Sequence, residues 1–437
     1  MLDAFDGCKK YYLTRIGEIF LNKFARASIW MIGAGIISGV FGYLFQIAIG
    51  RILDPGKYSL FAALMATVSV FGTLLNTISM VIAKEAAKNV ASKNFIKISR
   101  DFWSINTQAI YAGILLLIFF YIFAHPIKNY LNSQDVLPVY LLGLILFLVL
   151  PVTINNAFLQ GVKNFSWLGF GGILASILKV GFPVALYFMG YGFSGVISGV
   201  ALMYVFSWIF SAFGLRRYIN SKTYKIKSDS FLRFDWRAIL PIFLANIAFA
   251  LMTQFDVVLV NHYFAPDVSG LYASASVLGK AILYLPGGLV MALFPFASEG
   301  KALGKSGNKL LFQALLFTLF LCLSGSIFYF FFSAEVLSLF YGDRYLDASE
   351  LLKYYGFAIL PMSLVMVVEH FLIARGRVLF AYLFALVAPL QLFLTSIFHE
   401  ALLDVLLIMG GCGVLLIMLG FIFMLRILKS NNTQLLN

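Results

Sequence analysis

The chain has 437 residues, of which 61% are hydrophobic and only 12% are charged, and its mean hydropathy is +0.92. A water-soluble domain cannot bury so large an apolar fraction, so the composition excludes a soluble enzyme and favours a protein that spans a membrane. The net charge of +13 comes mainly from loop lysines and arginines, which is a topology signal, and no nucleic-acid binding is expected from it.

Residues 1–27 are polar and basic, and the apolar stretch behind them is too long for the core of a signal peptide. We predict a cytoplasmic amphipathic leader here, in which Leu13, Ile16, Phe20 and Phe24 share one helical face. The alternative is a basic leader that only sets the orientation of the chain.

Apolar stretches long enough to cross a bilayer recur along the whole chain, because about 20 apolar residues in a helix span about 30 Å of hydrocarbon. In the first half we predict spans at 28–50, 59–83, 105–124, 138–159, 169–189 and 192–214. In the second half we predict spans at 238–261, 269–297, 311–332, 354–374, 377–397 and 403–425. The expected fold is therefore an all-α polytopic membrane protein of about twelve transmembrane helices.

Lysines and arginines are distributed unevenly between the segments that join these helices. Most of the 32 lie on one side, in the leader, after the second helix, in the long loop and near the C-terminus. Cytoplasmic loops retain positive charge, so both termini are predicted to be cytoplasmic, with anionic lipid headgroups as contacts of the loops.

The predicted domains are the leader, an N-terminal six-helix bundle at 28–214, a basic cytoplasmic linker at 215–237, a C-terminal six-helix bundle at 238–428 and a cytoplasmic tail at 429–437.

Two turns of the chain resemble each other. The turn 53–62 and the turn 264–273 align so that Pro55 matches Pro266, Leu60 matches Leu271 and Ala62 matches Ala273. The ends of the fourth and tenth helices, 158–163 and 372–377, form a second related pair. We interpret the halves as two parallel pseudo-repeats of six helices around a central cavity, which opens alternately to either side. The alternative is that turns between apolar helices favour Pro, Gly and Asp in any case.

Two lysines lie near the predicted centre of the bilayer. A charge at that depth costs about 2.5 to 3.5 kcal/mol on insertion scales, so Lys179 and Lys280 need a polar or aqueous place. Lys179 shares a helical face with Gly172 and Ser176, and Lys280 shares one with Ser276 and Tyr284. Other predicted helices add the polar groups of Asn246, Asn76 and Gln46, the last on a face with Gly35, Gly39 and Gly42. We interpret these groups as a hydrated substrate site for an anionic group, best a phosphate or pyrophosphate. The alternatives are that the glycine and alanine stripes are helix-packing surfaces and that Lys179 snorkels or pairs with a carboxylate.

Three further titratable residues lie in predicted helices. Glu369 and His370 are either a proton or cation site or an interfacial pair near the cytoplasmic end. Asp256 either holds a cation or pairs with Arg51.

The cysteines carry no recognisable chemistry. Cys8, Cys322 and Cys412 lack the spacing of a metal site or of a disulfide framework. The segment 300–306 imitates a phosphate-binding loop but has one residue too few between its glycines. No metal, cofactor or catalytic group is predicted, and the expected class is a transporter rather than an enzyme.

The segment Gly50–Phe61 resembles the helix 1 to 2 signature of the bacterial polysaccharide-biosynthesis flippases, which include the O-antigen and capsule repeat-unit flippases. The run Asp256–Tyr272 is similar to the helix 7 to 8 signature of the group, and Phe158–Gly161 to the end of its helix 4. The group lies within the multidrug, oligosaccharidyl-lipid and polysaccharide exporter superfamily. This chain has Val257 where the group often has a basic residue, which weakens an ion pair carried over to Asp256.

The resemblance implies that the protein moves an undecaprenyl-pyrophosphate-linked oligosaccharide from the inner to the outer leaflet of the bacterial cytoplasmic membrane. It implies that Lys179 and Lys280 meet the pyrophosphate or acidic sugars while Arg51 guards the outer mouth, with a polysaccharide polymerase and glycosyltransferases as further partners. A cation-coupled multidrug exporter is the nearest alternative and would favour acidic residues at mid-cavity. A peptidoglycan-precursor flippase would be longer, and a membrane oligosaccharide polymerase or ligase would carry a large outside loop, whereas the longest predicted here is 333–353.

Overall fold

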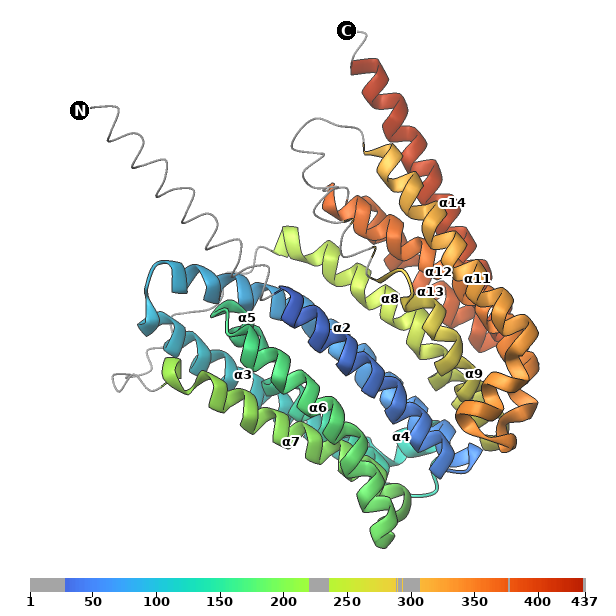
Figure 1. Cartoon of the computed structure of the whole chain (residues 1–437), viewed down its shortest axis with the longest axis horizontal. Helices are drawn as coiled ribbons and strands as arrows, with labels where there is room; N and C mark the ends of the chain where they lie inside the picture. The colour runs from blue at the N-terminus through green and yellow to red at the C-terminus, as the bar shows by residue number, and fades with distance from the viewer. Residues whose placement is uncertain are drawn as a thin grey trace. The chain divides into compact units, whose positions relative to one another are not determined.

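The computed structural model describes residues 28–219, 236–287, 289, 293, 307–375 and 378–434. Helices make up almost all of these ranges, which contain no strand (Figure 1). Several of the segments predicted from the sequence lie outside the described residues, namely the leader 1–27, most of the linker 215–237, most of 285–306 and the last three residues of the tail.

The first half of the chain forms long helices joined by short turns. After a first helix at Ser28–Ile52, the elements are α2 (Pro55–Ala91), α3 (Phe95–Ile122), the short α4 (Ala124–Tyr130), α5 (Leu137–Gly161), α6 (Phe165–Leu186), the π-helical turn η1 (Tyr187–Tyr191) and α7 (Gly192–Ile219). Helices of this length and apolarity satisfy their own backbone hydrogen bonds in hydrocarbon.

The second half repeats this pattern. Its elements are α8 (Trp236–Tyr263), α9 (Pro266–Tyr284), α11 (Asn308–Tyr341), the 3₁₀ helix η2 (Asp343–Ala348), α12 (Ser349–Ala374), α13 (Leu379–Ile397) and α14 (Leu402–Gln434). In the described part of the chain, ten helical segments are long and apolar enough to cross a membrane, and one of them joins α6 to α7. The predicted all-α polytopic fold is therefore confirmed, whereas the pseudo-repeat stays a prediction.

Some predicted boundaries are wrong. The segment 333–353 is largely helical rather than a loop, because α11 continues to Tyr341 and α12 begins at Ser349. The second helix continues past its predicted end at residue 83, because charged side chains do not end a helix that leaves the bilayer. It stops only at the turn where Lys93 adopts a left-handed φ of 54°.

Proline and glycine explain where several helices begin and end. Pro55 and Pro266 each occupy the first residue of a helix, where the missing N–H costs nothing. Gly190 and Gly192 have φ values of 96° and 54°, which lets the chain reverse between α6 and α7. Gly342 ends α11 with a φ of 87°, and its N–H donates to the carbonyl of Leu337.

The chain divides into two compact units, which are considered separately. The first unit comprises Met1–Phe45, Ser79–Leu115 and Phe147–Phe231, and the second comprises Gln46–Ile78, Leu116–Leu146 and Leu232–Asn437. The second unit thus combines the second half of the chain with one end of several helices from the first half. Because the units divide helices along their length, the bundle boundaries at 28–214 and 238–428 stay a prediction.

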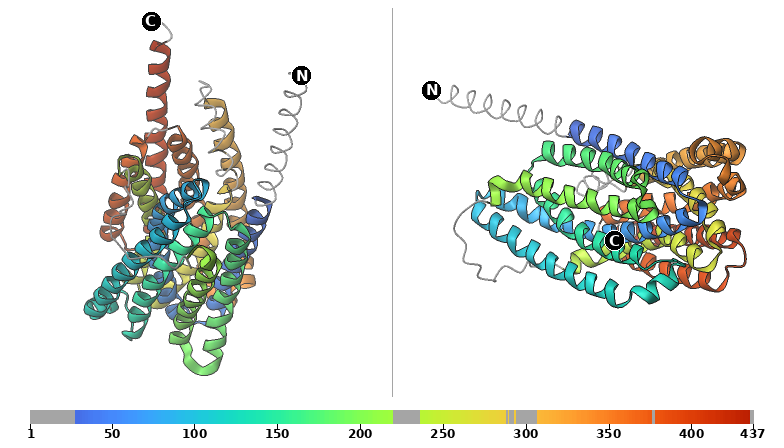
Figure 2. Two further views of the ribbon diagram at one scale, coloured as in Figure 1. Left: turned by 90° about the vertical axis from the view of Figure 1, so that its left-hand side faces the viewer. Right: turned by 90° about the horizontal axis from the view of Figure 1, so that it is seen from below.

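Within the first unit, α6 and α7 lie side by side in all views (Figures 1 and 2). A Cβ atom added at Gly199 of α7 would overlap the backbone of Pro183 in α6, and one at Gly195 would lie 3.0 Å from the carbonyl oxygen of Leu186. Small residues allow such close approach, and packing of this kind drives helix association in a membrane. These two glycines therefore hold the helix pair together.

We expect Gly199→Ala to force α6 and α7 apart and to destabilise the folded protein by about 1 to 3 kcal/mol, as overpacking usually does. The matched control is Gly181→Ala in α6, where a Cβ atom would have no neighbour among the described residues within 4 Å. It should leave stability unchanged or raise it by up to about 1 kcal/mol through helix propensity. Thermal midpoints of both variants in detergent measure the effect, and equal midpoints contradict the packing role of Gly199.

Candidate functional site

A cavity of about 520 Å3 lies inside the first unit, between the first helix, α5, α6 and α7. Glycines, alanines, serines and apolar side chains line most of it. Among the described residues that line it, Lys179 of α6 is the one charged side chain. The polar residues around it are Ser38, Asn156, Trp167, Ser176, Tyr204, Ser207 and Ser211.

Helical spacing explains why Lys179 faces the cavity. Gly172, Ser176 and Lys179 recur every three or four residues along α6 and so share one face of that helix. Gly35 and Gly42 of the first helix line the same cavity. Two stripes expected from the sequence therefore meet around one space.

Sequence reasoning misses the third wall. Met203, Ser207 and Ser211 line the cavity from α7 at intervals of four residues. This spacing is present in the sequence, but the helix carries no charge at that depth to draw attention to it. The serines spaced four residues apart on α7 are therefore the sequence signal from which this side of the cavity could have been predicted.

The glycines of the first helix are not close-packing positions. A Cβ atom added at Gly35, Gly39 or Gly42 would have no neighbour among the described residues within 4 Å. The interpretation of this stripe as a helix-packing surface is therefore wrong. Gly35 and Gly42 instead line the cavity that contains Lys179.

No carboxylate neutralises Lys179 within the described part of the chain. Its Nζ lies 4.8 Å from the centroid of the Phe45 ring, and no described Asp or Glu lies within salt-bridge distance of it. A cation–π contact contributes about 0.5 to 2 kcal/mol. That is below the cost of about 2.5 to 3.5 kcal/mol for a lysine at mid-membrane, so the ammonium favours water or an anion in the cavity.

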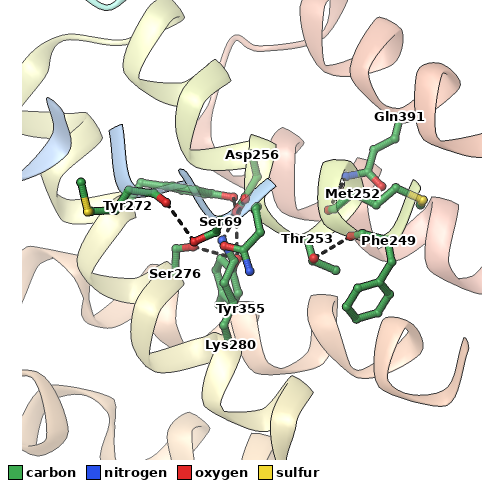
Figure 3. Close-up of polar contacts among 12 residues, drawn as sticks. Ser69, Phe249, Met252, Thr253, Asp256, Tyr272, Ser276, Lys280, Tyr355 and Gln391 are labelled. Atoms are coloured by element: carbon green, nitrogen blue, oxygen red, sulfur yellow. Dashed lines mark hydrogen bonds and ion pairs between the residues drawn. The ribbon is translucent and has the colours of Figure 1, made fainter. Parts of the chain in front are cut away.

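Lys280 lies in a different environment, inside the second unit. Its Nζ donates to Oδ1 of Asp256 at 2.9 Å, and the two side chains are only 8% and 1% exposed. The other carboxylate oxygen accepts hydrogen bonds from the hydroxyls of Tyr272 at 3.0 Å, Tyr355 at 2.9 Å and Ser276 at 3.4 Å (Figure 3). We call these five residues the Asp256 cluster.

The Asp256 cluster corrects two expectations. Lys280 offers no free cation to a substrate, because a buried carboxylate already neutralises it. Asp256 does not pair with Arg51, whose guanidinium donates instead to the backbone carbonyls of Leu339 and Phe340 in α11. Lys280 was expected to act like Lys179, but the structure gives the two lysines different surroundings.

The other predicted polar residues are dispersed. Gln254 donates to the hydroxyl of Tyr284 at 3.0 Å, and Asn246 donates to Oγ1 of Thr77 at 3.1 Å. The buried Oε1 of Gln46 has no hydrogen-bond partner among the described residues, and Asn76 is exposed. Their roles in substrate binding stay predictions.

Glu369 and His370 are adjacent in α12 but do not pair. Glu369 is 3% exposed and has neither a hydrogen bond nor an ion pair to the described residues. His370 uses Nδ1 to contact the carbonyl of Met366 at 2.8 Å, one turn earlier in the helix. The alternative of an interfacial ion pair is therefore wrong, whereas the proton or cation site stays a prediction.

Within the second unit, the two related turns lie against each other. A Cβ atom added at Gly56 would lie 3.1 Å from Cβ of Pro266, and one added at Gly270 would overlap the carbonyl of Pro55. Related segments of two parallel repeats are expected to meet in this way near a common axis. We call the contact of residues 53–59 with 266–270 the turn contact.

Side chains next to the turn contact bind the same parts of the chain together. The hydroxyls of Tyr58 and Tyr341 are 2.9 Å apart, and Tyr345 donates to the carbonyl of Gly50 at 3.0 Å. Sequence reasoning misses these tyrosines because it places the last two in a loop. Tyr58 and Tyr345 are almost fully buried, so the two halves of the chain are tightly joined here.

The fold is similar to solved transporters at low sequence identity. A multidrug resistance MATE family transporter of the MOP superfamily, in an inward-facing conformation, matches with a TM-score of 0.75 and 14% identity over 93% of this chain and 99% of that one. The lipid II flippase MurJ, in an inward closed conformation, matches with a TM-score of 0.72 and 16% identity over 92% and 87%. A eukaryotic MATE transporter matches with a TM-score of 0.64 and 16% identity over 92% and 96%.

Fold and helix length thus define a multi-pass membrane protein with the fold of the MATE transporters and of the MurJ flippase. A family described as polysaccharide biosynthesis protein matches residues 48–350. The chain belongs to this polysaccharide biosynthesis protein family. Among curated proteins, none matches the chain significantly.

Proposed function

We propose that the protein is a flippase that moves undecaprenyl-pyrophosphate-linked oligosaccharide repeat units across the bacterial cytoplasmic membrane for a surface polysaccharide such as O-antigen or capsule. The observation that carries the proposal is Lys179, the one charged side chain among the described residues lining its cavity. Such a cation attracts a diphosphate and repels a cationic drug. Membership of a polysaccharide biosynthesis family supports a lipid-linked glycan as the substrate class.

The proposed mechanism is alternating access with both termini in the cytoplasm. In that orientation the turn contact lies at the outer face, and Tyr58 with Tyr341 keeps this end shut while substrate enters from the cytoplasm. Delivery then requires the turn contact to separate. A polysaccharide polymerase would receive the repeat unit, and glycosyltransferases would supply it.

Lys179→Met tests the proposal. We expect at least a tenfold loss of translocation of a labelled lipid-linked oligosaccharide in proteoliposomes, and Lys179→Arg should retain part of the activity because it keeps the charge. The matched control is Lys309→Met, since Lys309 is an exposed lysine in the first turn of α11. Quencher access to the label measures translocation, and full activity of correctly inserted Lys179→Met would remove the proposed role of the cavity.

A cation-coupled exporter is the second candidate, and the buried Glu369 favours it. A carboxylate with 3% exposure and no described cationic partner suits a proton or a metal cation that binds during transport. The two functions differ in one measurement. Glu369→Gln should abolish transport driven by an imposed ion gradient in an exporter, whereas an uncoupled flippase should keep its initial rate.

A further inference from the structure

A second cavity, of about 420 Å3, lies at one end of the first unit and does not belong to the Lys179 site. It is formed by the turn between α5 and α6 together with the last residues of α7. Three cations line it, namely Lys163, Arg216 and Arg217, and all three are exposed. No described carboxylate lies within salt-bridge distance of them.

The scaffold that holds these cations is well defined. The N–H of Lys163 donates to the carbonyl of Gln160 at 3.0 Å, and Lys163 has a left-handed φ of 60°. Asn164 donates to the carbonyl of Gly214 at 3.4 Å and so ties the turn to α7. These hydrogen bonds hold the α5–α6 turn, which carries Lys163, against the end of α7, which carries Arg216 and Arg217.

Aromatic residues line the same cavity, namely Trp167, Phe213 and Tyr218. Trp167 stacks on Phe210 with ring centroids 4.5 Å apart and donates Nε1–H to the Phe210 carbonyl at 3.0 Å. This packing needs a glycine at 214, because a Cβ atom there would overlap the indole of Trp167. Trp and Tyr beside several cations are typical of the headgroup level of a membrane.

We propose that this second cavity binds a phosphate or diphosphate group carried by a membrane lipid. Two arginines and a lysine supply charge-assisted hydrogen bonds to phosphate oxygens. Trp167 lines both this cavity and the Lys179 cavity, so the two cavities are neighbours within the first unit. The proposal does not depend on flippase activity, because it concerns equilibrium binding at the end of the unit that is predicted to face the cytoplasm.

Calorimetric titration of the full chain in detergent tests the proposal with three probes: dihexanoyl-phosphatidylglycerol, dihexanoyl-phosphatidylcholine and a short-chain polyprenyl diphosphate. We expect an anionic probe to bind and the zwitterionic probe to bind at least tenfold more weakly. The comparison of the two anionic probes is made in the Lys179→Met variant, which removes the diphosphate site proposed above. Equal affinities for phosphatidylglycerol and the diphosphate then identify a bilayer phospholipid as occupant, whereas a diphosphate preference identifies a lipid-linked precursor. No preference for anionic probes over phosphatidylcholine overturns the proposal.

The triple variant Lys163→Gln, Arg216→Gln, Arg217→Gln should lose at least tenfold in affinity for the anionic probe. The matched control removes three exposed cations of the same unit that do not line the cavity, at Lys84, Lys88 and Lys93, and should stay within twofold of the unaltered protein. Equal losses in both triple variants reveal a general surface field and overturn the site, as does an unchanged affinity of the first. Lys179→Met should keep the affinity for dihexanoyl-phosphatidylglycerol even where translocation is lost, so failure of the site and failure of the flippase proposal are distinguishable.

Discussion

Replacing Lys280 alone with Met should destabilise the protein by about 3 to 5 kcal/mol, because breaking a buried ion pair leaves an uncompensated charge. The Asp256 carboxylate is 1% exposed on its side chain, so water cannot replace the missing ammonium. About 1.4 kcal/mol corresponds to a factor of ten, so the folding equilibrium should fall more than a hundredfold. The fraction of monodisperse protein in detergent and its thermal midpoint measure the loss.

The double variant Asp256→Asn, Lys280→Met is the matched comparison. It removes both charges and keeps a hydrogen-bonding group for the hydroxyls of Tyr272 and Tyr355. We expect it to recover most of the stability that the single variant loses, as replaced buried ion pairs often do. A Lys280→Met variant as stable as the unaltered protein would mean that Asp256 does not need this partner and would contradict the ion pair.

This cluster shows where sequence reasoning ends. A simple antiparallel register through the turn between α8 and α9 places Asp256 opposite about residue 273, roughly two helical turns from Lys280. The pair forms because long side chains on a helix point back toward its N-terminus, which for Lys280 is the direction of Asp256. Periodicity assigns each residue to a face, but it does not show how far along a neighbouring helix a flexible side chain reaches.

The Lys179 cavity was more accessible to sequence reasoning. Its α6 wall is a single stripe of Gly172, Ser176 and Lys179, and spacing along one helix is enough to place these residues on one face. The function of the first-helix glycines was not accessible in this way. A glycine stripe is compatible with tight packing and with open space, and only the positions of neighbouring helices decide between them.

The turn contact lies between these two cases. The similarity of the two turns predicts that they are related, and their proximity fits a common axis. Tyr341 and Tyr345 beside them, however, come from a segment that composition assigns to a loop. Residues 333–353 contain enough polar groups to resemble a loop, yet aromatic side chains such as Tyr341 and Tyr345 bury themselves against the first turn. Packing of these tyrosines, which the local sequence does not reveal, therefore accounts for the helical structure of this segment.

Locking the turn contact should arrest transport completely, which makes a cross-link the sharpest test of alternating access. Gly56→Cys combined with Pro266→Cys places two thiols where Cβ atoms are 3.1 Å apart, close to the separation of about 3.5 to 4.5 Å in a disulfide. Oxidation should abolish translocation in proteoliposomes, and a reducing agent should restore it. The same treatment should not alter binding of the anionic probe at the second cavity, because its residues belong to the first unit.

The controls are the two single-cysteine variants, which experience the same oxidation without forming the cross-link. All variants carry Cys8→Ser, because Cys8 lies outside the described residues, whereas Cys322 and Cys412 are buried and free and should not react in these controls. A cross-linked protein that still transports at the rate of its reduced form would show that the turn contact need not open. In that case Tyr58, Tyr341 and their neighbours would be a permanent structural joint, and the path to the far side of the membrane would have to lie elsewhere.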